Sequence, residues 1–284
     1  MNDTALTIVL IAAVLHASWN AIVKGAGDRA VAMAAVAGAH VVVGGIALFF
    51  VAPPAAASWP FIIASAIIHY AYYAFLFLSY RFGDLSHVYP IARGVAPMLV
   101  AFGALVFAGE MLVPKAWGGV IAVSLGIGLL AIRRNGALAA ERSAVMAALA
   151  TGLMIASYSV VDGMGIRLSD TPPGYIAWIF FLEFPITLGI LAYRGRTLAA
   201  LPWRSVAIAF SGGLLSVLAY GLVLFAKTIA PLAAVSAVRE SSVIIAALIG
   251  VVLFHERPWG RRVLAALIVA AGVILLAMAE APKP

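Results

Sequence analysis

The sequence contains no cysteine among its 284 residues. Disulfide bonds, thiolate metal sites and iron–sulfur clusters are therefore excluded. Charge is also scarce, because Asp, Glu, Lys and Arg together make up 10% of the chain, whereas soluble domains contain about 25%. Hydrophobic residues reach 65%. A soluble fold could not bury this much apolar surface, so we expect the lipid bilayer to be the solvent.

Apolar runs recur along the chain, and each is long enough to cross about 30 Å of hydrocarbon as a helix. A membrane β-barrel would need alternating apolar and polar positions, which the run from Leu99 to Phe107 lacks. The first run follows Asn2 and Asp3 rather than a basic leader, so we interpret it as a retained helix and not a signal peptide. We expect an all-α integral membrane protein with about ten transmembrane helices. They are predicted at 4–23, 31–51, 60–80, 86–108, 114–132, 143–161, 174–193, 205–226, 232–254 and 262–279.

The two halves of the chain repeat each other. When the sequence around Glu110 is aligned with that around Glu256, Arg93 aligns with Arg239 without a gap. When residues 24–29 are aligned with residues 162–167, two glycines and one arginine coincide. We predict a first five-helix repeat over 1–137 and a second over 138–284. Because five is an odd number of crossings, the second repeat enters the membrane inverted, as in many secondary transporters.

Three motifs resemble those of EamA-type transporters in the drug/metabolite transporter (DMT) superfamily. They are Ser18-Trp19-Asn20, Tyr158-x-x-x-Asp162-Gly163-x-Gly165-x-Arg167 and the Gly109-Glu110 turn. The resemblance spans nearly the whole chain. It implies a ten-helix bundle around a central cavity, with the fifth and tenth helices at the periphery, and export of amino acids or other small metabolites.

One part of the chain departs from the pattern of that family. In that family a proline commonly precedes the glutamate of this turn in each half, and Pro97 precedes Glu110 in the first half. In the second half Val243 replaces the proline, and His255 replaces the glycine before Glu256. These departures predict a straighter helix over 232–254.

Four charged residues lie within predicted spans, where an unpaired charge costs several kcal/mol. Arg93 and Arg239 are equivalent under the repeat, and their guanidinium groups are suited to bind a carboxylate or a phosphate. The alternative is that each arginine pairs with a glutamate and only holds helices together. Glu240 follows Arg239 by about 100° of helix rotation, so we expect both to border one cavity without facing each other, and one to face water. Glu183 is interpreted as a structural ion pair or hydrogen-bond partner, or as a proton carrier.

Polar and aromatic residues at helical spacing predict a hydrogen-bonding cavity. His16, Trp19, Asn20 and Lys24 share one face of 4–23, and His69, Tyr72, Tyr73 and Tyr80 share a face of 60–80. Packing is the alternative for His69, and an interfacial aromatic belt is the alternative for Trp19 and Tyr80. We expect His40 to be structural. The candidate substrate-binding residues are Trp19, Asn20, His69, Tyr73, Tyr89, Arg93, Tyr158, Tyr220, Arg239 and Glu240.

Small residues recur every fourth position at Gly118, Ala122 and Gly126, which predicts a close helix contact. Catalytic motifs are missing: His255-Glu256 lacks the second histidine of a metalloprotease helix, and no Gly-x-x-x-x-Gly-Lys-[Ser/Thr] loop is present. We therefore expect no enzyme activity, no cofactor and no metal.

The sequence thus predicts a multi-pass secondary transporter of the cell (inner) membrane that exports a small polar metabolite, with amino acids preferred, by alternating access. The alternative substrates are organophosphates, phosphonates or other organic anions. A membrane enzyme or receptor is a third class, which the inverted repeat disfavours. The expected partners are the small-molecule substrate and the lipid bilayer, with no nucleic acid, and the chain is expected to be a monomer or a weak homodimer.

Basic residues are distributed unequally between the two predicted sides of the membrane. Twelve of the eighteen lysines and arginines fall on the side opposite the termini, whereas four, including Lys227, fall on the side of the termini. The positive-inside rule places the richer side in the cytoplasm. The charge bias therefore predicts external termini, whereas many members of the resembled family have cytoplasmic ones.

Overall fold

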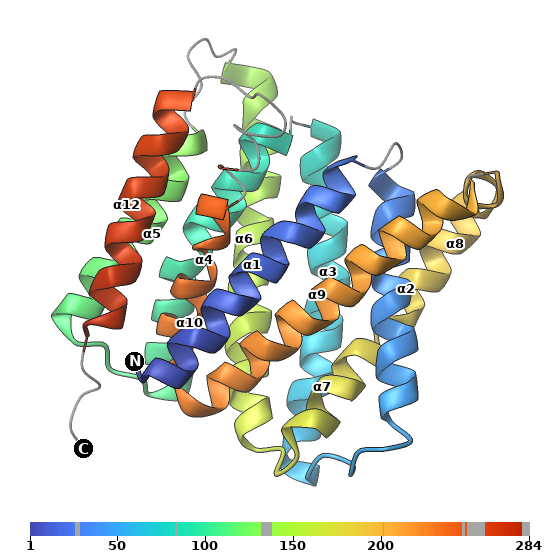
Figure 1. Cartoon of the computed structure of the whole chain (residues 1–284), viewed down its shortest axis with the longest axis horizontal. Helices are drawn as coiled ribbons and strands as arrows, with labels where there is room; N and C mark the ends of the chain where they lie inside the picture. The colour runs from blue at the N-terminus through green and yellow to red at the C-terminus, as the bar shows by residue number, and fades with distance from the viewer. Residues whose placement is uncertain are drawn as a thin grey trace.

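The computed structural model describes residues 1–25, 29–82, 85–131, 138–200, 202–245, 248 and 259–279. In these residues the only regular secondary structure is helical, which confirms the all-α prediction. The helices form one bundle (Figure 1). The Met1 ammonium group donates to the carbonyl oxygen of Ala279 at 2.9 Å, so the two ends of the described chain lie at the same end of the bundle.

Each predicted helical segment contains a helix in the structure. The helices are α1 (Asp3–Gly25), α2 (Arg29–Ala47), η1 (Ala56–Ser58), α3 (Trp59–Phe82), α4 (Leu85–Ala108), α5 (Pro114–Ala131), α6 (Leu138–Arg167), α7 (Pro172–Phe181), α8 (Phe184–Ala199), α9 (Trp203–Ile229), α10 (Leu232–Arg239) and α12 (Trp259–Ala277). Helix α6 extends beyond its predicted end, because it continues through Asp162 and Gly163 to Arg167 instead of ending at 161, and α8 likewise continues to Ala199 instead of ending at 193. Buried hydrogen bonds to Asp162 stabilise this polar residue inside the helix.

Two predicted spans are broken by a turn. The span predicted over 174–193 divides at Leu182 and Glu183 into α7 and α8. The span predicted over 232–254 turns at Glu240 and Ser241, where both N–H groups bond three residues back, to Ala237 and Val238. The prediction of a straighter helix there was therefore wrong. By contrast, α4 is continuous although it contains Pro90 and Pro97.

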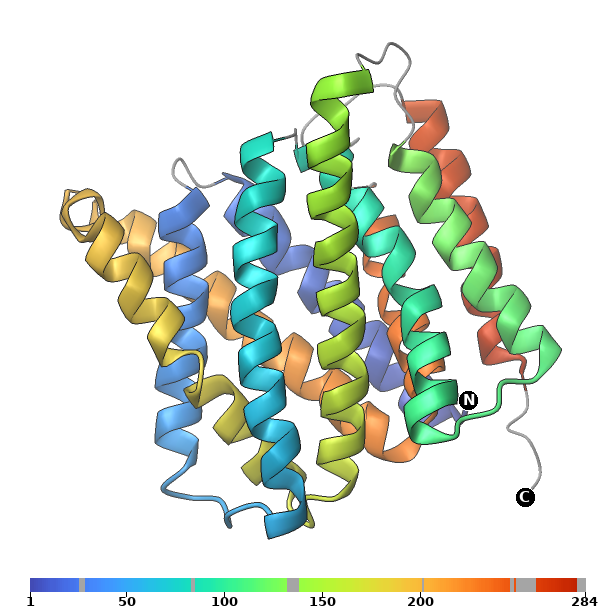
Figure 2. The same ribbon diagram turned by 180° about the vertical axis from the view of Figure 1, so that it is seen from behind.

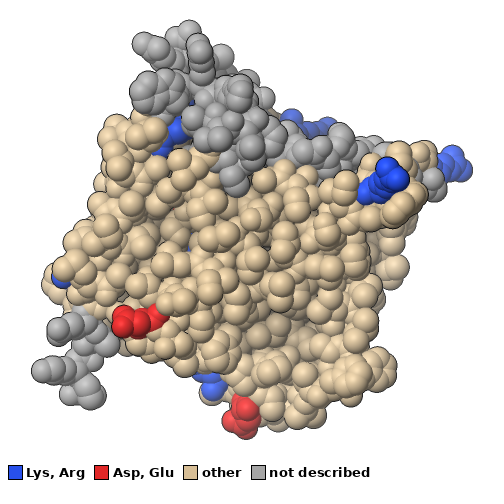
Figure 3. All heavy atoms as spheres, viewed as in Figure 1, with Lys and Arg blue, Asp and Glu red and all other residues tan. Residues whose placement is uncertain are grey.

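Length, composition and surface identify a multi-pass membrane protein. Within the described residues, eight helices are long and apolar enough to cross a bilayer, and α7 with α8 counts as one of these. The apolar part of α2, Met33–Ala47, is shorter, and α10 has eight residues. On the face in Figure 3, the Lys, Arg, Asp and Glu side chains lie towards the ends, and a broad middle region carries none. This region is suited to contact with lipid tails.

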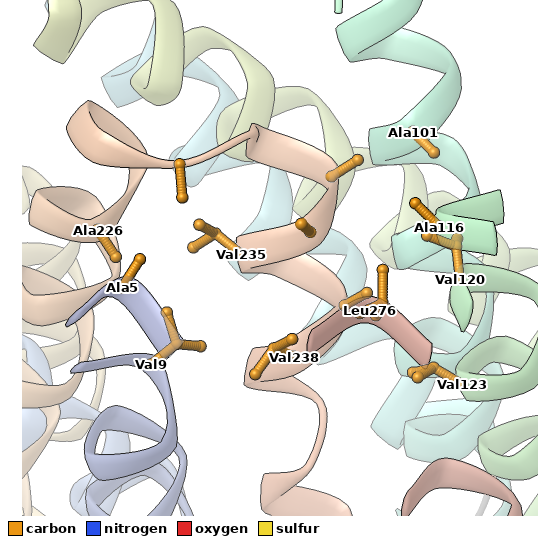
Figure 4. Packing of buried hydrophobic residues seen from close by; sticks show 14 of the residues in the cluster. Ala5, Val9, Ala101, Ala116, Val120, Val123, Ala226, Val235, Val238 and Leu276 are labelled. Carbon is orange, nitrogen blue, oxygen red and sulfur yellow. The ribbon is translucent and has the colours of Figure 1, made fainter. Parts of the chain in front are cut away.

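The largest cluster of buried apolar residues surrounds α10. Side chains of α1, α4, α5, α9 and α12 pack around Val235 and Val238 (Figure 4). Most members of the cluster are alanine or valine. Small side chains allow helix backbones to approach closely, which is the main source of packing energy between helices in a membrane.

Helices α5 and α12 pair at one side of the bundle, as both ribbon views show (Figure 2). A Cβ atom at Gly126 would lie 3.0 Å from the carbonyl oxygen of Ala265, and one at Gly119 would lie 2.8 Å from that of Gly272. Gly126 therefore belongs to a close helix contact, as predicted. Gly118 does not, because no atom lies within 4 Å of its Cβ position. The stripe on α5 runs through Gly119 and Gly126 instead.

Candidate functional site

Arg93 of α4 and the adjacent pair Arg239 and Glu240 at the end of α10 form a cluster of three charges, which we call the charge cluster. Arg93 Nε lies 2.9 Å from Glu240 Oε2, and Arg239 Nη2 donates to Glu240 Oε1 at 3.3 Å. The three residues are 5%, 4% and 1% exposed. Two expectations for Arg239 and Glu240 were wrong. Their side chains contact each other because α10 ends at Arg239, and neither faces water.

The charge cluster carries an excess of positive charge, since two guanidinium groups share one carboxylate. Its hydrogen bonding is also incomplete. Within the part of the chain that the structure describes, neither Arg93 Nε nor Arg239 Nε has a hydrogen-bond partner, and Glu240 Oε2 accepts no hydrogen bond. The contact of Arg93 Nε with Glu240 Oε2 is therefore an ion pair in which the N–H group does not point at the carboxylate oxygen. Forked N–H donors with excess positive charge are suited to bind a carboxylate or a phosphate.

Helix α1 supplies the neighbouring polar groups of the charge cluster. Arg93 Nη2 and Trp19 Nε1 each lie 3.2 Å from a different ring nitrogen of His16. A neutral imidazole accepts a hydrogen bond at only one nitrogen, so His16 can accept from either Arg93 or Trp19, but not from both. Asn20 Nδ2 donates to the backbone oxygen of His16 at 2.7 Å. The His16 face of α1 thus points into the bundle. The side chain of Lys24 lies outside the described residues.

Aromatic side chains from three helices form a second group. The His69 ring stacks on Tyr158 at 4.2 Å, and Tyr158 also contacts Tyr72 at 5.7 Å and Tyr220 at 6.0 Å. His69 Nδ1 lies 2.9 Å from the backbone oxygen of Ser65, an acceptor, so Nδ1 carries the hydrogen and Nε2 is the accepting nitrogen. We call His69, Tyr72, Tyr158 and Tyr220 the aromatic wall.

Two further candidates have different surroundings. The Arg93 guanidinium lies over the Tyr89 ring, 5.8 Å from its centroid, which is within the range of a cation–π interaction. Tyr73 points its hydroxyl at Glu183 Oε2, 3.3 Å away, and so belongs to a different polar group. The side chain of Tyr80 lies outside the described residues. Among the described residues, no group of three metal-ligating side chains is present.

Comparisons with known proteins agree with this architecture. Residues 142–278 match the family described as "EamA-like transporter family". This chain is an EamA-like member of the DMT superfamily. A solved structure titled "Crystal structure of protein" superposes on it with a TM-score of 0.74 and 18% identity, and the match covers 97% of this chain and 96% of the other. At this identity the likeness shows the fold alone. None of the curated proteins compared with the chain matches it.

The Tyr158 to Arg167 motif of the EamA-like chain places Asp162 in a buried polar group beside the aromatic wall. Both Tyr220 and Tyr175 donate to the Asp162 carboxylate. Lys227 is 0% exposed, and its Nζ donates to the backbone oxygen of Ser159 at 2.8 Å. Its assignment as a loop cation was therefore wrong. The apolar run around Lys227 continues to Ile229, which could have indicated that α9 extends past it.

The other EamA-like motif, Gly109-Glu110, ties four helix ends together. Gly109 has a φ of 65°, the left-handed conformation that glycine adopts most easily and that ends α4. The Glu110 carboxylate contacts Arg167 Nη1 at 2.8 Å and accepts from Leu232 N at 2.7 Å. Arg167 also donates to the backbone oxygens of Lys227 and Ala230. The motif thus closes the end of the bundle nearest the termini. Glu256, its counterpart in the predicted repeat, and His255 lie outside the described residues.

Proposed function

We propose that this EamA-like protein is a secondary transporter of the cell (inner) membrane. It exports a small polar metabolite, with amino acids preferred, by alternating access to a central site. Two inverted five-helix repeats, 1–137 and 138–284, would supply the two gates. The family match to 142–278 supports a unit that begins near the middle of the chain. The eight apolar spans, together with α2 and the segment that begins with α10, account for ten helices in all.

The unbalanced charge of the charge cluster carries the substrate assignment. Two buried guanidinium groups share one carboxylate, and an unpaired charge within a membrane costs several kcal/mol. The carboxylate of a substrate would pair with these guanidinium groups and accept hydrogen bonds from Arg93 Nε and Arg239 Nε, which have no hydrogen-bond partner among the described residues.

The remaining parts of an amino acid also find suitable partners. Glu240 Oε2 accepts no hydrogen bond from the described residues and can receive the α-ammonium group. The aromatic wall, with Trp19 and Asn20 from α1, would contact the variable side chain. Aromatic rings provide contact area together with a polar edge, which suits a site for several related side chains. An organophosphate would use the two arginines without Glu240, and this is the alternative substrate class.

Uptake into proteoliposomes tests this function. Purified protein is reconstituted and supplied with radiolabelled amino acids and other small metabolites, with and without a pH gradient, and empty liposomes serve as the control. We expect protein-dependent uptake of an amino acid that unlabelled amino acids inhibit and organophosphates do not. Inhibition by organophosphates alone would support the alternative class, and the absence of uptake across the panel would contradict the transporter proposal.

A further inference from the structure

A further buried carboxylate, apart from Glu240 and Asp162, lies among α2, α3, α7, α8 and α9, on the other side of the bundle from α10 (Figure 1). Glu183 stands at the turn between α7 and α8 and is 5% exposed. Its Oε2 lies 3.0 Å from His40 Nδ1 and accepts from the Tyr73 hydroxyl at 3.3 Å. His40 Nε2 lies 3.1 Å from Ser216 Oγ. Four helical segments therefore meet at one carboxylate–imidazole contact.

The charge at this contact depends on a proton. Among the described residues, His40 is the one ion-pair partner of Glu183. A carboxylate beside a neutral imidazole would leave a net negative charge in the membrane interior, which costs several kcal/mol. One proton, on either Glu183 Oε2 or His40 Nδ1, makes the pair neutral. A bound proton therefore removes a charge from this buried contact.

Among the described residues, the side chains that bond to the pair and to its turn are polar and carry no fixed charge. Tyr73 of α3 donates to the carboxylate itself, and Ser216 of α9 contacts the imidazole. Tyr70 of α3 donates to the backbone oxygen of Leu182 at 2.7 Å, and Thr187 of α8 donates to that of Glu183 at 3.4 Å. These hydroxyl groups can bond to the pair in either charge state, so the net charge of the pair depends on whether a proton is bound.

The backbone at Glu183 is suited to movement. Pro185 has no N–H group and cannot continue the helical hydrogen bonds, and Ile186 N bonds to Glu183 O, three residues back. The Leu182 oxygen is stabilised by a side chain, Tyr70, instead of the helix. A break of this kind lets α7 and α8 move as separate rods. Such a movement would change the access of water to Glu183.

Contacts also lead from this pair to the aromatic wall. Tyr73 packs edge-on against Tyr72 at 5.3 Å, and Tyr72 packs against Tyr158 at 5.7 Å. On α9, Ser216 lies one helical turn before Tyr220, which donates to Asp162. A change in the protonation of Glu183 would act on Tyr73 and thus on the helix that carries His69 and Tyr72.

We propose that Glu183 and His40 form a proton-binding pair that couples a proton gradient to substrate export. The pair takes up one proton on the acidic side as substrate leaves there, holds it in the contact between Oε2 and Nδ1, and releases it on the other side as the next substrate binds. This inference rests on the proposed transport function.

The coupling test compares two modes of transport by one variant. Counterflow of labelled against unlabelled substrate needs no gradient, whereas accumulation against a concentration difference does. In Glu183→Gln and His40→Gln, accumulation driven by a pH gradient should fall to the level without a gradient, although counterflow continues. Thr151→Val is the matched control, because it removes a buried hydroxyl that donates within α6 to Ala147 and belongs neither to the pair nor to its turn, and it should keep both modes. Gradient-driven accumulation by Glu183→Gln at the wild-type level would overturn the proposal.

A second measurement does not depend on transport. Infrared difference spectra of the wild-type protein at acidic and neutral pH should contain a protonated carboxyl band that Thr151→Val retains and Glu183→Gln lacks. Glu183→Asp keeps a carboxyl group and should shift the band, so this variant decides the matter if Glu183→Gln does not fold. If both Glu183 variants show the same band as the wild type, the band does not come from Glu183, and proton binding by the pair is contradicted. If the wild-type protein moves no substrate, the proposed function fails, and this band alone decides whether the pair binds a proton.

Discussion

Replacing Glu240 with glutamine should destabilise the protein far more than the same change at Glu110. Glu240→Gln leaves Arg93 and Arg239 buried without a counter-charge, with side chains only 6% and 5% exposed. Removing one partner of a buried ion pair costs about 3–5 kcal/mol. The Glu110 pair is more exposed, since the Arg167 side chain is 33% exposed, and exposed pairs contribute about 0.2–1 kcal/mol. Glutamine at 110 can also still accept from the backbone N–H of Leu232.

Thermal unfolding in detergent measures this difference. The midpoint of Glu240→Gln should be several degrees below that of Glu110→Gln, and Glu110→Gln should lie close to wild type. A carboxylate-bearing substrate should raise the midpoint of the wild-type protein. Equal midpoints for the two variants would refute the argument that Glu240 neutralises a buried positive cluster.

Two further predictions concern the aromatic residues Trp19 and Tyr158 and the orientation of the chain in the membrane. Trp19→Ala and Tyr158→Ala should raise the apparent substrate constant more than they lower protein abundance, because these rings bind through contact area; reduced abundance with unchanged kinetics would make them packing residues. From the charge bias, a cysteine introduced at Ser143 should resist an impermeant thiol reagent added outside intact cells, whereas one at Ala56 should react. Reaction at Ser143 with protection at Ala56 would place the termini in the cytoplasm.

The helical bundle could be predicted from the sequence because its signal is repeated along the chain. Apolar runs fix the approximate position of each helix, and a boundary error of a few residues does not alter the fold. The break at Glu240 was missed because the prediction relied on proline and glycine. In α4, Pro90 and Pro97 leave the helix continuous, whereas the turn after Arg239 forms without either residue. Hydrogen bonds three residues apart at Glu240 and Ser241 depend on tertiary contacts, which a linear pattern does not contain.

The candidate residues could be named, but their partners could not. Arg93, Arg239 and Glu240 were conspicuous as charges within apolar segments, yet the sharing of one carboxylate by both arginines is a property of the packing of α4 against α10. His40 was interpreted as structural because it stands alone in its segment. Its contact with Glu183 joins residues 143 positions apart in the chain. Spacing within a single segment cannot predict such a pair.

The most direct test of the central claim is counterflow by the wild-type protein and by single arginine variants. With a labelled amino acid that the wild type exchanges, the unlabelled amino acid should compete and its carboxamide, which lacks the carboxylate, should not. Arg93→Ala and Arg239→Ala should each abolish exchange while the protein still inserts into the membrane, and lysine at either position should restore it only in part, because an ammonium group cannot form the fork. Full exchange by both alanine variants, or equal competition by the carboxamide, would contradict binding of a carboxylate by the charge cluster.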